Sequence, residues 1–316
     1  YNKLIPGLQK YGGSGELIHE FFEPIKNSEY NPTTGFGIKF DEKVDKNKKD
    51  AIGYITRGCV ARCTFCQRAS KGYRVYAADH NLEAYLEELK EKYNVGLVTF
   101  GDENFGSNRK QSYEIARIMK KHDMLWRAGF RPTSITYEDL KFFKEHNMVA
   151  LLIGIESGSK KILNIMEKKY TAESVYKVVK MAKKLDLYIG SCIDGVVLGM
   201  PGETKETIIE SAQFVASLRH LLGLDWNISA PFMAAAIPGT PLYEYCQQIG
   251  VIGKTLDEEE DYLIRSSEHK HTQILNYVNK TDSSIKEVHY WKYLYHYVGK
   301  KAYVDLIIKN NKSIRN

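Results

Sequence analysis

Short apolar, β-rich runs recur six times along this chain, and most are followed by a segment with the apolar spacing of a helix. Strands that alternate with helices predict right-handed crossovers and a parallel sheet. Six units are too few to close an eight-stranded barrel. The sequence therefore predicts an α/β fold, an open partial TIM-type (βα)6 barrel. The six runs span residues 51–56, 95–101, 125–130, 149–156, 187–199 and 226–233.

The connections that follow three of these predicted strands are rich in glycine, proline and acidic residues. They cover residues 103–106, 156–159 and 199–203. Parallel α/β proteins place their chemistry at the carboxyl ends of their strands, which is where these connections lie. A loop with three cysteines follows the first predicted strand and opens on the same edge. This edge is the candidate site.

The repeats occupy residues 51–250, which predicts a core domain between two flanking segments. Residues 1–50 form a short N-terminal segment. Because it begins with Tyr1 rather than methionine, we expect a trimmed chain in which this segment is a linker from a missing upstream domain. Residues 251–316 are rich in aromatic residues. Their spacing predicts a helical extension that packs on the barrel as a cap, rather than a separate binding module.

Charge and composition narrow the class of protein. The formal net charge is +6, too small and too scattered to indicate nucleic acid as a partner. No run approaches the ~20 apolar residues of a membrane span, and the first residues do not form a secretory signal. The chain has five cysteines, three of them crowded together. This pattern suits metal ligation in a reducing cytosol better than disulfides, so we expect a cytoplasmic protein.

The cysteine loop (residues 57–66, RGCVARCTFC) holds Cys59, Cys63 and Cys66. One interpretation is a zinc site with His80 as the fourth ligand, although His80 lies beyond the tight spacings of structural zinc sites. Another is a [4Fe–4S] cluster held at three corners, with one iron open to a substrate or cofactor. Cys192 and Cys246 are expected to be small buried residues rather than ligands.

Five motifs in this order resemble the radical S-adenosylmethionine (SAM) superfamily, over roughly residues 50–250. Their residues are most like the motifs of the subfamily that often carries a cobalamin-binding domain upstream. No D-x-H-x-x-G motif for a corrinoid occurs in the chain. The motifs are RGCVARCTFC (57–66), TFGDENF (99–105), IGIESGSKKILNIMEKK (153–169), VVLGMPGETKET (196–207) and IPGTPLYE (237–244).

The resemblance implies that Cys59, Cys63 and Cys66 ligate a [4Fe–4S] cluster. It also assigns contacts with SAM to the loops of the first two strands. Phe65 is expected to pack near the adenine. Residues Asp102, Glu103 and Asn104 stand where the family meets the methionine amino group, although this stretch departs from the commoner Gly-Gly-Glu wording. The alternative for these three residues is an acidic turn that caps the next helix.

The resemblance makes Glu156 a ligand of the ribose hydroxyls; the alternative is a helix N-cap. Gly195, Val197 and Gly199 approximate the glycine motif that lies against the adenine. The run from Gly199 to Gly202 is expected to form a tight turn that lets the adenine approach the backbone. Arg127 is expected to bind a carboxylate of the cofactor or substrate, or else to form a structural ion pair.

The implied activity is reductive cleavage of SAM to a 5′-deoxyadenosyl radical, which abstracts hydrogen from a substrate in the barrel. A flavodoxin or ferredoxin is the expected reductant, and the substrate cannot be read from the sequence. Cobalamin-assisted methyl transfer is one outcome. The alternatives are cobalamin-free cyclisation, rearrangement or sulfur insertion. A non-catalytic zinc or iron–sulfur module belongs to a different class; it explains the cysteines but leaves Glu156 and the Gly-Pro turn without a purpose.

Overall fold

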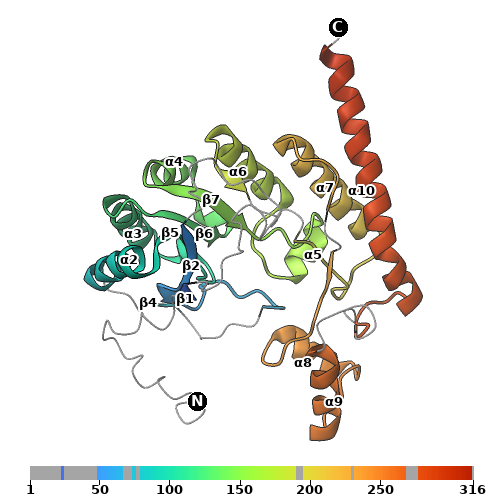
Figure 1. The fold of residues 1–316 in the computed structure, drawn as a ribbon. Helices are drawn as coiled ribbons and strands as arrows, with labels where there is room; N and C mark the ends of the chain where they lie inside the picture. The colour runs from blue at the N-terminus through green and yellow to red at the C-terminus, as the bar shows by residue number, and fades with distance from the viewer. Residues whose placement is uncertain are drawn as a thin grey trace. The chain divides into compact units, whose positions relative to one another are not determined.

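The computed structural model describes residues 23–24, 48–66, 73–75, 79–189, 195–228, 231–267 and 277–314. Cys192 lies outside these residues. The chain divides into two compact units, each built from several stretches of sequence. The first unit comprises described residues within 1–60, 68–154 and 178–192, and the second those within 61–67, 155–177 and 193–316. Figure 1 labels the elements of both units.

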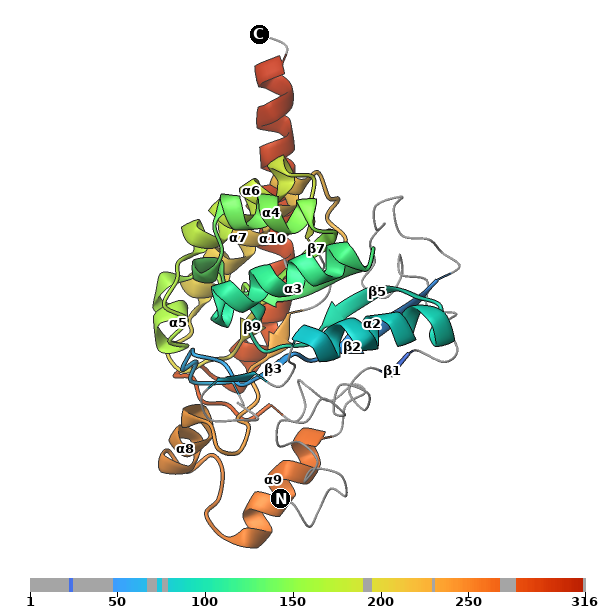
Figure 2. The same ribbon diagram turned by 90° about the vertical axis from the view of Figure 1, so that its left-hand side faces the viewer.

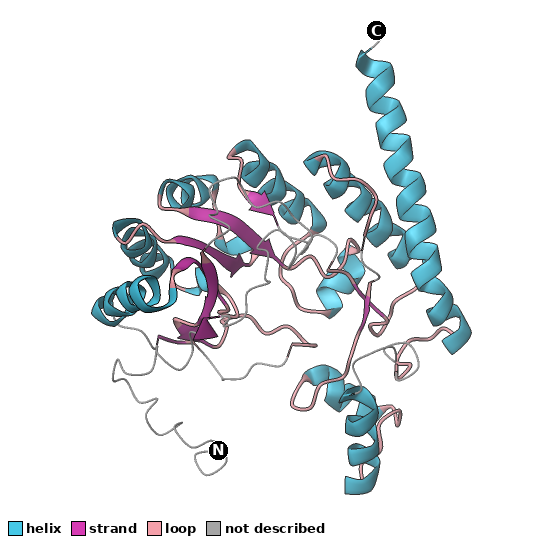
Figure 3. Cartoon of the chain, in the orientation of Figure 1, coloured by secondary structure: helices cyan, strands magenta, loops and turns pink. Residues whose placement is uncertain are grey.

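The first unit is built on a six-stranded sheet with the order β1-β2-β5-β6-β7-β8. Strand β1 pairs antiparallel with β2, and the remaining pairs are parallel. Figure 3 shows these strands in magenta. The strands are β1 (Glu23–Pro24), β2 (Lys49–Gly53), β5 (Val95–Phe100), β6 (Leu125–Phe130), β7 (Met148–Ile153) and β8 (Tyr188–Ile189). A separate hairpin joins β3 (Thr56–Arg57) to β4 (Arg74–Val75).

Helices connect consecutive strands of this sheet, as a parallel arrangement requires. Their apolar faces are buried; Leu82, Leu86 and Leu89 of α2 are almost completely shielded from solvent. Helix α4 begins with a capping box, in which Thr136 and Asp139 satisfy each other's backbone N–H groups. The helices are α2 (Asp79–Tyr93), α3 (Arg109–Lys121), α4 (Tyr137–Glu145) and α6 (Ala172–Lys184), with short 3₁₀ turns at Phe105–Ser107 and Pro132–Ser134.

The second unit contains a parallel pair, β9 (Val197–Leu198) and β10 (Phe232–Met233), and a set of helices. Helix α10 lies along α7, and Figures 1 and 2 both show them side by side. Val288, Trp291 and Tyr295 of α10 share a buried cluster with Ile208 and Val215 of α7. The helices are α5 (Lys160–Ile165), α7 (Lys205–Leu222), α8 (Pro241–Gln248), α9 (Leu256–Ser267) and α10 (Ile285–Ile314).

These βα repeats confirm the predicted fold class, an α/β protein of the partial TIM-barrel type. Within the expected strand at 187–199 the described residues include β8 and β9, and within the expected strand at 226–233 the described residues that form a strand are Phe232 and Met233 of β10. At the start of the latter segment, the Arg219 guanidinium donates to the carbonyl oxygens of Asp225 and Asn227. None of the described helices is long and apolar enough to cross a membrane.

Candidate functional site

The cysteine loop leaves β3 through Gly58, whose φ of +84° is the left-handed conformation that glycine adopts most easily. Cys59 is half-buried, Cys63 is buried and Cys66 is exposed. Thr64 anchors the loop within the second unit. Its N–H donates to the carbonyl of Met166 (3.1 Å), its hydroxyl donates to the carbonyl of Ile165 (2.9 Å), and its carbonyl accepts from the N–H of Leu242 (3.0 Å).

The alternative ligand sets are only partly described. Helix α2 begins at Asp79, so His80 lies at the start of a helix as predicted; its side chain is outside the described residues. Among the side chains that the structure describes, no three or more of His, Cys, Asp and Glu are gathered around a point that could hold a single metal ion. Cys246 is completely buried in an apolar cluster, as expected of a small core residue.

Glu156 and Lys168 form an ion pair next to the cysteine loop. The Nζ atom of Lys168 lies 2.9 Å from Oε1 of Glu156, and 5.4 Å from the ring centres of Phe65 and Tyr170. Burial by itself lowers the pKa of Lys168, but the charges of Glu156, Tyr170 and Cys63 outweigh burial and raise it. Lys168 is therefore a permanent buried cation between an acid and the cysteine loop.

Glu156 also positions the glycine motif through its backbone. Its N–H donates to the carbonyl of Gly195 (3.1 Å), and its carbonyl accepts from the N–H of Val197 (2.8 Å). Its φ of +59° is unusual for a residue with a side chain. The surrounding contacts hold this conformation in place. The structure thus brings together Glu156, Gly195, Val197 and Phe65, four residues that the sequence singled out.

The run from Gly199 to Gly202 is a tight turn, as predicted, with φ of +82° and +75° at the two glycines. A buried carboxylate closes it: Oε2 of Glu203 accepts from the N–H groups of Gly199 (2.7 Å) and Met200 (3.2 Å). Burial raises the pKa of Glu203 to about 7. The Tyr277 hydroxyl donates to the carbonyl of Gly199 (2.7 Å), and a Cβ on Gly199 would lie 2.6 Å from that hydroxyl. Tyr277 therefore fills the side of Gly199 where a side chain would project.

Residues 102–104 lie in the first unit, and two of the three side chains have protein partners. The Asp102 carboxylate accepts from the N–H groups of Ile55 and Thr56 and from the Thr56 hydroxyl. Burial raises the pKa of Asp102 to about 6. Asn104 is buried and accepts from the N–H of Arg131 (3.2 Å). Glu103 is exposed.

Of this stretch, Asn104 stands at the N-cap position of the next helical element, the 3₁₀ turn Phe105–Ser107, but its side chain makes no cap hydrogen bond there. Helix α3 begins instead at the N-cap Asn108, whose side chain accepts from the N–H of Gln111. Asp102 ties the end of β5 to the start of β3, where the cysteine loop begins.

Arg127 points to a partner within its own sheet. Its Nη2 lies 3.3 Å from Oδ2 of Asp50, and its Nε donates to the Thr99 hydroxyl (2.6 Å). Both charged side chains are 4% exposed. Burial raises the pKa of Asp50 to about 6, although Arg127 acts in the opposite direction. The structure thus shows the ion pair that was one of the two alternatives for Arg127.

Sequence reasoning missed Lys168 and Tyr277. Lys168 stands inside a motif that the sequence singled out, but its neighbour Lys169 has the same chemistry and is exposed. The left-handed conformation of Glu167 and Lys169 turns one lysine inward and the other outward. Tyr277 is one of 22 tyrosines, and nothing local distinguishes it.

The βα repeats, the cysteine loop, the Glu156–Lys168 pair and the glycine turn are the features of a candidate cofactor site in an α/β protein. The profile of the radical SAM superfamily matches residues 54–215, so this chain belongs to that superfamily. The superfamily uses a [4Fe–4S] cluster and SAM, as the sequence predicted.

Two curated relatives are methyltransferases. An uncharacterized methyltransferase of Pyrococcus horikoshii is 28% identical over 253 residues, which cover 77% of this chain and 52% of that protein. The bacteriochlorophyllide d C-8(2)-methyltransferase of Chlorobaculum tepidum is 28% identical over 275 residues, 79% of this chain and 56% of that protein. The chain thus spans about half the length of these relatives.

A solved structure shares the fold. The radical SAM methyltransferase TsrM of Kitasatospora setae, with cobalamin and a [4Fe–4S] cluster bound, superposes with a TM-score of 0.52 at 16% identity. The match covers 65% of this chain and 38% of TsrM. This likeness confirms the fold and carries no further assignment.

Proposed function

We propose that residues 51–250 form a radical SAM core in which Cys59, Cys63 and Cys66 hold a [4Fe–4S] cluster, and that the enzyme transfers a methyl group. The observation that carries the proposal is the Glu156–Lys168 pair beside Phe65. It places a carboxylate, a buried cation and the cysteine loop next to one another, which a simple electron-carrying module has no need for.

The chain's own residues fit such a cluster and its cofactor. Three thiolates carry negative charge, and the cation of Lys168 near Cys63 compensates part of it. Lys168 contacts Oε1 of Glu156, and among the described residues no other hydrogen bond reaches that carboxylate. Its second oxygen is available to accept from the ribose hydroxyls of SAM. The exposed carboxylate of Glu103 is the candidate for the methionine amino group.

When bound, the reduced cluster supplies the electron that cleaves SAM to the 5′-deoxyadenosyl radical. The protein's part is to position the cofactor and to exclude water. A flavodoxin or ferredoxin is the proposed electron donor, and a reducing cytoplasm is the proposed location. The names of the two relatives support methyl transfer, and cobalamin is the proposed methyl carrier because the motifs resemble the cobalamin-associated subfamily.

Product analysis under anaerobic conditions tests the proposal. Reconstituted protein is expected to contain iron and sulfide, and with SAM and a strong reductant to form 5′-deoxyadenosine. Replacement of Cys59, Cys63 and Cys66 by alanine should abolish both. Cys246→Ala, a change to a buried thiol outside the cysteine loop, is the matched control and should preserve them.

Two outcomes would contradict the proposal. Zinc in place of iron in anaerobically purified protein would indicate a structural metal site. An intact cluster without 5′-deoxyadenosine would indicate an electron carrier. S-adenosylhomocysteine as a second product supports methyl transfer, because one SAM must donate its methyl group; its absence with the true substrate would favour cyclisation, rearrangement or sulfur insertion.

A further inference from the structure

The outward face of α10 carries side chains at an alternating spacing of three and four residues. We call this set the outer seam; it consists of Tyr290, Tyr293, Tyr297, Lys300, Val304 and Ile307. Tyr293 and Tyr297 are 73% and 70% exposed. This spacing repeats every 3.5 residues, as at the positions where one helix packs against another in a coiled coil. A second stripe of α10, with Val288, Trp291 and Tyr295, already packs on α7. Helix α10 thus has one face packed on α7 and a second, exposed stripe with the spacing of a helix-packing seam.

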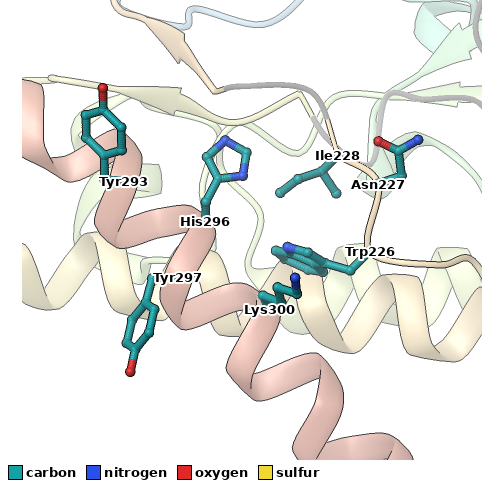
Figure 4. A pocket seen from close by; sticks show the side chains of 7 residues that line it. All are labelled: Trp226, Asn227, Ile228, Tyr293, His296, Tyr297 and Lys300. Carbon is teal, nitrogen blue, oxygen red and sulfur yellow. The ribbon is translucent and has the colours of Figure 1, made fainter.

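A pocket of about 500 Å³ lies beside the outer seam (Figure 4). Helix α10 contributes Tyr293, His296, Tyr297 and Lys300, and the loop after α7 contributes Trp226, Asn227 and Ile228. A Cβ on Gly299 would lie 2.4 Å from the Trp226 ring, so the indole can lie here only because residue 299 is glycine. Glycine inside a helix costs roughly 0.5–1 kcal/mol relative to alanine. The wall of the pocket is therefore built at a cost to the helix.

Helix α9 carries a stripe of the opposite charge. Leu256, Glu260 and Leu263 follow one another at spacings of four and three residues, and all three are exposed. Residues 257–261 are all acidic. Tyr262 is buried and its hydroxyl donates to the carbonyl of Ala236 (2.6 Å), which fixes the face of α9 that points outward.

The two stripes complement each other. Each has apolar side chains on either side of one central charge, a lysine on α10 and a glutamate on α9. The end of α10 is basic: residues 300–312 contain four lysines and one aspartate, a net charge of +3. This charge disfavours pairing of α10 with its own copy and favours an acidic helix. Figures 1 and 2 both show α9 and the carboxyl end of α10 far apart in the second unit, so they do not meet within one chain.

We propose that α9 of one copy packs against the outer seam of α10 in a second copy, and reciprocally, so that the protein forms a two-fold symmetric dimer. Glu260 of each copy then pairs with Lys300 of the other. Leu256 and Leu263 meet the apolar residues on either side of Lys300 in either helix orientation. Because the interface is isologous, the same contact forms twice, which doubles the buried area.

This dimer can be tested by reversing the charge at each of the two paired positions and then at both together. Sedimentation velocity of the full chain over a series of protein concentrations measures the dimer dissociation constant. The wild-type chain is expected to dimerise. Lys300→Glu and Glu260→Lys should each weaken the dimer about tenfold or more, since each places like charges together. The double variant restores an opposite pair and should recover most of the lost affinity. Both positions are exposed, so the variants should fold, and circular dichroism verifies this.

Lys309→Glu and Asp257→Lys are the matched controls, because they make the same charge changes off the seam positions. They are expected to change the dissociation constant of the dimer much less than Lys300→Glu and Glu260→Lys do. A wild-type chain that stays monomeric at every concentration would overturn the proposal and would indicate that another partner covers the seam. A dimer that the single variants leave unchanged, or that the double variant fails to restore, would also overturn it. None of these results depends on the proposed enzymatic function.

Discussion

Two acidic side chains follow strands of the same sheet but are stabilised in different ways. Asp102 comes two residues after β5, and Glu156 comes three residues after β7. Asp102 is buried and accepts only from neutral donors, so burial raises its pKa to about 6. Glu156 instead meets the cation of Lys168, and its side chain is 18% exposed. The comparison separates an acid that organises the backbone from one that can also receive a ligand.

The largest expected effect is that of removing the cation. Lys168→Met leaves the partly buried Glu156 carboxylate without its partner, and breaking a buried ion pair in this way costs about 3–5 kcal/mol. We expect the free energy of unfolding to fall by an amount near the lower end, because Glu156 is not fully buried. Urea denaturation measures it. Lys169→Met, a change to the exposed neighbour, should have almost no effect; equal effects of the two variants would contradict the role of Lys168.

Glu156→Ala tests whether Glu156, unlike Asp102, binds a ligand. Loss of the hydrogen bonds that the ribose hydroxyls donate to a charged carboxylate costs roughly 1.5–3 kcal/mol, about ten- to a hundredfold in the affinity for SAM. Titration calorimetry on cluster-loaded protein measures the dissociation constant, and iron content should stay unchanged. Asp102→Asn keeps one of the two acceptor oxygens and is expected to change SAM binding much less than Glu156→Ala does. An unchanged dissociation constant for SAM in Glu156→Ala would indicate that Glu156 has a structural role only.

Glu203 provides a pH test of a buried carboxylate whose hydrogen-bond donors are all neutral. Burial raises its folded pKa from 4.5 to about 7, so the folded state binds more protons than the unfolded state between these values. Its contribution to stability is present below about pH 4.5 and is lost as the pH rises to about 7, by at most about 1.4 kcal/mol per pH unit. Urea denaturation at several pH values should show a weaker pH dependence in Glu203→Gln. Parallel curves for the two proteins would refute this.

The smallest expected effect concerns Tyr277, which covers Gly199. Tyr277→Phe keeps the ring but removes the donor to the Gly199 carbonyl, at a cost of about 1 kcal/mol in unfolding free energy. Tyr290→Phe, at an exposed position, is the control and should be neutral. A larger loss for Gly199→Ala is expected as well, since an added Cβ would collide with Tyr277 at a positive φ. Equal stability of both tyrosine variants and the wild type would show that the hydrogen bond contributes nothing.

The repeating βα architecture, the cysteine loop and the turn from Gly199 to Gly202 could all be predicted from the amino-acid sequence. These features depend on short-range patterns: the spacing of apolar residues, the closely spaced cysteines and glycines at positive φ. The capping box of Thr136 and Asp139 is equally local. The expected strand at 226–233 was the exception, since only Phe232 and Met233 among its described residues pair in a sheet.

Which side chains contact one another could be seen only in the folded chain. Lys168, and not its neighbour Lys169, pairs with Glu156, and Tyr277 contacts Gly199 across a separation of 78 residues. Arg127 likewise pairs with Asp50, which lies 77 residues earlier in the chain. A charged or aromatic residue occurs at many positions in the sequence, and the residue type alone does not indicate which contact it makes. Its role follows from burial, because a buried carboxylate must find a donor or a cation and packing determines which one is within reach.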